Sequence, residues 1–66
     1  MTVTLNGEPR ELSVPLTLAG LLRQLGLDPR AVVVEHNRVI VRPPELGDRA
    51  IAEGDQIEVV HFVGGG

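Results

Sequence analysis

The residues with the clearest chemical potential are the last four, Val63-Gly64-Gly65-Gly66. Glycine has no side chain and tolerates almost any backbone conformation, and the last glycine carries a free α-carboxylate. Fully extended, these four residues reach about 13–14 Å at roughly 3.3–3.6 Å per residue. Such a thread would fit a narrow channel in a partner protein and present the Gly66 carboxylate to a reagent buried there. A frayed end or a remnant of cloning would give the same glycines.

The composition excludes most other chemistry. The chain has 66 residues, of which 42% are hydrophobic and 23% are charged, as expected for one small folded domain without a deep enzyme cleft. Cysteine is absent, which excludes disulfides, thiol nucleophiles and thiolate metal sites. The two histidines, His36 and His61, are too few for an ordinary zinc site. We therefore expect no bound metal or cofactor.

The net charge and the hydropathy of the chain argue against nucleic-acid and membrane partners. Nine acidic residues against six basic ones, a net charge of −3 and a single aromatic residue, Phe62, argue against nucleic-acid binding. No segment approaches the roughly 18 apolar residues of a membrane span, and the start of the chain does not resemble a signal peptide. These patterns predict a cytoplasmic protein with no membrane partner. The classes of function that remain are a carrier protein and an interaction module.

The first part of the chain predicts a β-hairpin followed by a helix. Residues 1–5 alternate apolar and polar, Asn6-Gly7 favours a type I′ turn, and a second strand is predicted over 8–14. Pro9 cannot donate a ladder hydrogen bond, so this second strand belongs at a sheet edge. The helix is predicted from a leucine stripe at i, i+3, i+4 and i+7, with an N-cap before it and a C-terminal glycine after it: Thr17, Leu18, Leu21, Leu22, Leu25 and Gly26.

The second part of the chain predicts three more strands. Two β-branched runs, 31–35 and 39–41, are joined by a tight turn at His36-Asn37-Arg38. Pro43-Pro44 is expected to end the second run and to begin an irregular crossing that extends to residue 50. A turn at Gly54-Asp55 then introduces the last strand, predicted over 56–62.

This order of elements resembles the ubiquitin-like β-grasp. That is an α+β fold with a mixed sheet of four to five strands, one main helix and, here, a flexible C-terminal glycine tail. One apolar helix face must cover one face of the sheet. The strand order comes from the resemblance, which places the last strand beside the first, in parallel, at the sheet centre. We expect a β-grasp domain over 1–63 and the tail over 64–66.

Three stretches, in matching order and spacing, resemble the bacterial sulfur carrier proteins of thiamine biosynthesis, the ThiS-like proteins. They are residues 3–8, 34–41 and 51–66, and the last includes the Gly54-Asp55 turn and the terminal glycines. The resemblance covers essentially the whole chain. It implies a co-substrate of other enzymes and not an enzyme.

The chemistry implied by the resemblance takes place at Gly66. An adenylating enzyme related to ubiquitin-activating enzymes would use ATP and magnesium to convert this carboxylate to an acyl adenylate. A persulfide sulfur supplied by a cysteine desulfurase would then displace AMP and leave a thiocarboxylate. Thiazole synthase would take that sulfur into the thiazole ring, with a deoxyxylulose phosphate and a glycine-derived imine as its other substrates. Val63, Gly64 and Gly65 would form the part of the tail that the partners bind.

The last strand suggests a docking surface for these partners. Because side chains alternate along a strand, Ile57, Val59 and His61 share one face, and Glu58, Val60 and Phe62 share the other. If the first set packs under the helix, Val60 and Phe62 form an exposed apolar patch beside the tail, with Glu58 next to it. A twisted strand end with Phe62 over the core rim is the alternative.

The remaining polar residues have simpler interpretations. Glu53, Asp55 and Glu58 could meet a basic partner surface, or could form a solvated acidic edge. His61 is interpreted as a packing or solvated residue and His36 as a structural or solvated one.

Other functions remain open from the sequence. One is a sulfur carrier for tRNA thiolation or for molybdopterin synthesis, because selection of the pathway resides in partner surfaces. A second is a β-grasp interaction module with incidental glycines. A third is a protein modifier whose Gly66 is joined to a target amine. No pair of a nucleophile and a base suggests an enzyme.

Overall fold

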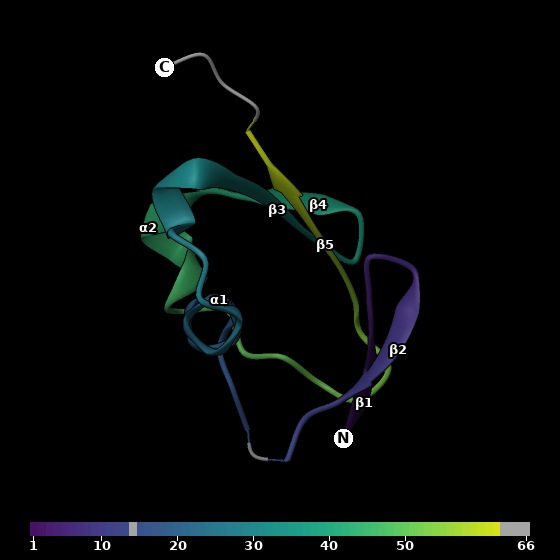
Figure 1. Ribbon diagram of the computed structural model, residues 1–66. Coiled ribbons are helices and arrows are strands. Elements are labelled where there is room, and N and C mark those ends of the chain that lie inside the picture. Colours follow the sequence, from purple (N-terminus) through teal and green to yellow (C-terminus); the bar gives the residue numbers. More distant parts are fainter. Residues whose placement is uncertain (14, 63–66) are drawn as a thin grey trace.

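The computed structural model describes residues 1–13 and 15–62 and shows a five-stranded mixed sheet with α1 packed against one face (Figure 1). In chain order the elements are β1 (Thr2–Leu5), β2 (Glu8–Glu11), α1 (Leu18–Leu25), the 3₁₀ helix η1 (Pro29–Ala31), β3 (Val32–His36), β4 (Val39–Val41), α2 (Pro43–Leu46) and β5 (Gln56–His61). The strand order is β2-β1-β5-β3-β4, so the last strand lies at the centre. It runs parallel to β1 and antiparallel to β3, which confirms the β-grasp prediction.

The first hairpin forms as the sequence predicts, but its second strand is shorter. Asn6 and Gly7 have φ angles of 51° and 83°, the positive values that a type I′ turn needs. β2 is exposed at the sheet edge and ends at Glu11, not at residue 14. It ends there because Glu11 lies opposite Thr2, and Leu12 already exchanges hydrogen bonds with Met1, so β1 offers no further partner. Val14 lies outside the described residues.

Helix α1 follows its sequence signals closely. The Thr17 hydroxyl accepts a hydrogen bond from the Gly20 N–H at 3.1 Å, and Gly26 ends the helix in the left-handed region at a φ of 72°. The inward-facing leucines are Leu18, Leu21 and Leu22, each 1% exposed. They pack into one core with sheet residues from β1, β3, β4 and β5: Val3, Val32, Val34, Val41 and Ile57. The helix therefore fixes which face of the sheet is buried.

Two predictions for the second half of the chain were wrong in detail. The turn after β3 has two residues, Asn37 and Arg38, both at positive φ, so His36 belongs to the strand. The expected irregular crossing begins instead with the short helix α2, because proline suits the first positions of a helix, where no N–H bond is needed. Its Leu46 is 2% exposed and joins the core.

The central strand β5 ends one residue earlier than predicted. Its last residue is His61, although the Phe62 N–H still donates to the Ala31 carbonyl at 2.9 Å. On the β3 side, the backbone contacts therefore continue to the last described residue. Figure 1 shows β5 running along the sheet toward the end of the chain that carries the predicted tail.

Candidate functional site

The candidate site lies at the end of β5. The predicted modification residue Gly66 and the tail residues Val63, Gly64 and Gly65 lie outside the described residues, as does the predicted boundary at residue 63. What the structure describes is the strand that leads to them and the surface around its end. β5 lies between β1 and β3 at its start, and β3 alone continues to pair with it as far as His61.

The predicted alternation of faces along β5 is confirmed. Ile57 is buried and Val59 packs against the core, whereas Val60 and Phe62 are 59% and 60% exposed. Glu58 is also exposed on this outer side. Phe62 does not close over the core rim, because more than half of its surface faces solvent.

Two further apolar residues extend this exposed surface. Val33 lies opposite Val60 in the β3–β5 register, and Ile40, on β4, is 63% exposed. Val33, Ile40, Val60 and Phe62 are called the open-face patch below. A groove of about 210 Å³ runs beside it, lined by Pro29, Arg30, Val32, Val33, Ile40, Val41, Arg42, Pro43 and Phe62. The patch thus adjoins a concave surface with arginines near it, beside the end of β5.

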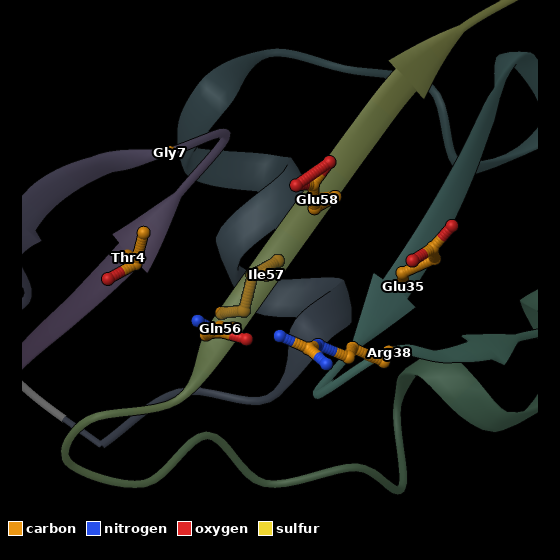
Figure 2. Close-up of a pocket in the computed structure, with 7 residues that line it drawn as sticks. All are labelled: Thr4, Gly7, Glu35, Arg38, Gln56, Ile57 and Glu58. Carbon is orange, nitrogen blue, oxygen red and sulfur yellow. The ribbon is translucent and has the colours of Figure 1, made fainter.

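An acidic hollow lies on the same sheet face, nearer the start of β5 (Figure 2). Its volume is about 200 Å³ and its lining residues are Thr4, Gly7, Glu35, Arg38, Gln56, Ile57 and Glu58. Glu35 and Glu58 are direct cross-strand neighbours, and Figure 2 shows both on the face away from α1. Like charges placed opposite each other destabilise a sheet. Within residues 1–13 and 15–62, Arg38 forms no ion pair with either carboxylate.

The three acidic residues considered from the sequence separate in space. Glu58 alone faces the open side beside the patch. The Glu53 carboxylate accepts a hydrogen bond from the Thr2 N–H at 3.0 Å, at the opposite end of β5. Asp55 turns inward and is held by three donors: the His36 ring, the Ala52 N–H and the Asn37 amide. A single acidic surface built from all three is therefore not formed.

Asp55 and His36 form a pair that the sequence did not indicate. Their side chains are 13% and 8% exposed, and His36 Nε2 lies 2.6 Å from Asp55 Oδ2. Burial acts to raise the pKa of Asp55, but the hydrogen bonds from His36, Ala52 and Asn37 outweigh it, and the net pKa is lowered. His36 is thus structural, one of the two interpretations made from the sequence, whereas His61 is exposed.

Two asparagines were interpreted from the sequence only as turn residues. Asn6 and Asn37 each turn a side chain onto β5, at Val59 and at Gln56. The only sequence signal for these contacts is an Asn at the first turn position. That signal does not indicate which strand the side chain contacts.

The described residues show neither a metal site nor a membrane span. Among residues 1–13 and 15–62, no group of three or more His, Asp or Glu side chains is arranged to hold a metal ion. No helix in this part of the chain is long and apolar enough to cross a membrane.

Comparison with known proteins decides the family. The sequence profile of the ThiS family matches residues 3–66, nearly the whole chain. This chain belongs to the ThiS family. The sulfur carrier protein ThiS of Thermus thermophilus is 39% identical over 64 residues, which cover 97% of this chain and 98% of that protein. The crystal structure of the thiamine biosynthesis protein (ThiS) from Geobacter metallireducens matches with a TM-score of 0.85 at 29% identity, over 100% of both chains.

Other relatives of this ThiS-family chain are much longer. A thiazole synthase of Magnetococcus marinus is 48% identical over 66 residues, which is all of this chain but 20% of that protein. The chain therefore spans about a fifth of the length of that relative. A ThiS-like unit thus occurs both as a small protein and within a protein named thiazole synthase.

Proposed function

We propose that this protein is a sulfur carrier of thiamine biosynthesis, a co-substrate and not a catalyst. The observation that carries the proposal is the family match through residue 66, joined to full-length similarity with a protein named as a sulfur carrier. The fold supports it, because β5, the last strand before the tail residues, is the central strand of the sheet. In this proposal the reacting group is the Gly66 carboxylate.

The proposed chemistry makes a poor electrophile reactive. A Gly66 carboxylate oxygen attacks the α-phosphorus of ATP, held with magnesium by an adenylating enzyme, and pyrophosphate leaves. The terminal sulfur of a persulfide, made by a cysteine desulfurase, then attacks the acyl carbon and AMP leaves. A second thiol breaks the resulting S–S bond, forming a disulfide and releasing the Gly66 thiocarboxylate. The carrier contributes no acid, base or metal to these steps, and its part is to present the terminus.

Thiazole synthase is the proposed acceptor of the sulfur. The support is the presence of a ThiS-like unit inside a relative with that name, since two units that act together gain effective concentration when they are joined. Because the proposed partners use ATP and cysteine-derived sulfur, the proposal places the protein in the cytoplasm.

Partners are proposed to dock on the open-face patch. Val60 and Phe62 expose large apolar side chains within a few residues of Gly66, where a partner that takes the tail must also lie. Burying them supplies non-directional affinity, and Glu58 beside them favours a partner with a basic rim.

Mass spectrometry of the C-terminal fragment tests the function. The protein is incubated with ATP, magnesium, a sulfide source and the adenylating enzyme of the same organism, and then treated with an alkylating agent. We expect one oxygen of Gly66 to be replaced by sulfur and that sulfur to be alkylated. A chain that carries one added alanine after Gly66 is the matched control and should remain unmodified. An unmodified wild-type terminus, with an enzyme that activates its own carrier, would overturn the proposal.

Adding thiazole synthase to the thiocarboxylate form tests the pathway. We expect the sulfur to leave Gly66 and appear in the thiazole product. A thiocarboxylate that is stable with active thiazole synthase would instead indicate a carrier for tRNA thiolation or molybdopterin synthesis.

A further inference from the structure

β5 pairs with β3 over a longer stretch than with β1. On one side, β3 pairs with β5 from His36↔Ile57 to Val32↔His61. On the other side, β1 pairs only through Thr4↔Gln56 and Leu5↔Ile57 and then ends. The part of β5 that leads to the chain end would therefore lack a neighbour on the β1 side.

The side chain of Asn6 takes the place of the missing strand. Its Oδ1 accepts a hydrogen bond from the Val59 N–H at 2.8 Å, and its Nδ2 donates to the Val59 carbonyl at 3.3 Å. The Asn6 backbone N–H also donates to the Ile57 carbonyl at 2.9 Å. A carboxamide carries the same donor and acceptor as a peptide group, so Asn6 continues the ladder by one step after β1 has turned away.

The turn itself holds this side chain in place. Asn6 is at a φ of 51° and is followed by Gly7 at 83°, so the backbone is fixed in a type I′ turn. Glycine at position 6 would keep the turn but lose the carboxamide. Aspartate would keep an acceptor for the Val59 N–H and lose the donor to the Val59 carbonyl.

The second hairpin repeats the arrangement at the start of β5. The Asn37 Oδ1 accepts from the Gln56 N–H at 2.8 Å, and its Nδ2 donates to Asp55 at 3.2 Å. Asn37 thus fixes where β5 begins. Within the described residues, Val59 is the last position of β5 that is hydrogen-bonded from the β1 side.

We propose that Asn6 is a positioning residue for the reacting terminus: by holding Val59 it supports the last part of β5 on the side where β1 has ended, opposite the pairing with β3. The proposal rests on the carrier function. Gly66 lies seven residues after Val59, a reach of at most about 25 Å. Within the described residues, loss of the Asn6 contact would leave β3 as the only neighbour of β5 from Glu58 onward, and reaction at Gly66 requires placement to about 1 Å.

The expected kinetic signature is a higher KM with an unchanged kcat. Once bound, the adenylating enzyme orders the terminus itself, so a carrier that has lost the Asn6 contact must be ordered during binding. Asn6→Gly should raise the KM for the carrier about two- to tenfold, the range set by one or two lost hydrogen bonds. Asn6→Asp should lie between this variant and the wild type.

Thr17→Ala is the matched control. Like Asn6→Gly, it removes a side-chain oxygen that accepts a backbone N–H, but it acts at the start of α1 and away from β5. Pyrophosphate release is measured at increasing carrier concentration for all variants, well below their unfolding temperatures. Hydrogen exchange at the Val59 amide of the free protein is measured in parallel.

A raised KM and faster Val59 exchange in Asn6→Gly, but not in Thr17→Ala, would support the positioning role. Equal KM values for the two variants would overturn it and leave Asn6 a purely stabilising residue. If Asn6→Gly does not fold, the same comparison is made with Asn6→Asp. Wild-type protein that releases no pyrophosphate with active enzyme overturns the carrier function itself, an outcome distinct from equal KM values.

Discussion

His36 and Asp55 are joined by a hydrogen bond of 2.6 Å that connects the end of β3 to the turn before β5. Both side chains are largely buried, and Asp55 also accepts from the Ala52 N–H at 2.8 Å. In the described part of the chain, His36 Nδ1 is buried without a hydrogen-bond partner, so the ring is held through Nε2. The pair therefore anchors the start of the central strand β5 to the end of β3.

Acid should remove the contribution of this pair to stability. The pKa of Asp55 is lower in the folded protein than the value of about 3.9 expected when unfolded, so its contribution is fully present above that value. It is lost as the pH falls through the lowered pKa. Urea unfolding from pH 7 to pH 2.5 should show this loss in wild type and a weaker one in Asp55→Asn. Parallel pH profiles for the two proteins would contradict the prediction.

At neutral pH, the same substitution should destabilise the protein. Asp55→Asn weakens charge-assisted hydrogen bonds in a mostly buried site, and we expect the free energy of unfolding to fall by about 1–3 kcal/mol. Asp48→Asn, at a solvent-exposed aspartate, is the control and should change it by less than about 0.5 kcal/mol. Urea midpoints at pH 7 measure both.

Local signals explain why most elements could be predicted from the sequence. Asn6-Gly7 specifies a turn by its backbone preferences, and the α1 leucine stripe lies between a Thr17 cap and the Gly26 end, all within ten residues. Pro43-Pro44 predicts the end of a strand but equally suits the first turn of a helix, so the sequence alone does not predict α2. The strand order required knowledge of the fold.

The contacts that organise the site are long-range and carry no local signal. His36 and Asp55 are 19 residues apart, and Asn6 and Val59 are 53 apart. Both Asn side chains contact β5 only because the sheet places one hairpin turn on each side of it. The exposure of Val60 and Phe62, by contrast, followed from strand alternation and needed only the face covered by α1.

Glu58 should destabilise the free protein and favour its association with a basic partner. Because Glu35 and Glu58 are direct neighbours, Glu58→Lys replaces a repulsive pair by an attractive one and should stabilise the protein by about 0.2–1 kcal/mol. If a basic partner docks here, the same variant should associate about tenfold more slowly at low salt. Urea unfolding and stopped-flow association measure the two effects. Glu8→Lys, on β2, makes the same change in net charge away from the patch, and an equal loss of rate there would indicate only general attraction.

The open-face patch should matter for partner binding and not for folding. Val60→Ser and Phe62→Ser remove apolar surface that already faces solvent, so we expect the free energy of unfolding to change by less than about 0.5 kcal/mol. Activation by the adenylating enzyme should fall at least about tenfold in kcat/KM, because burying a large apolar side chain contributes about 1.5–3 kcal/mol. The control is Val39→Ser: Val39 is 51% exposed, but it pairs with His36 and so belongs to the other face of the sheet. Equal losses of kcat/KM in all three variants would place partner docking elsewhere on the protein.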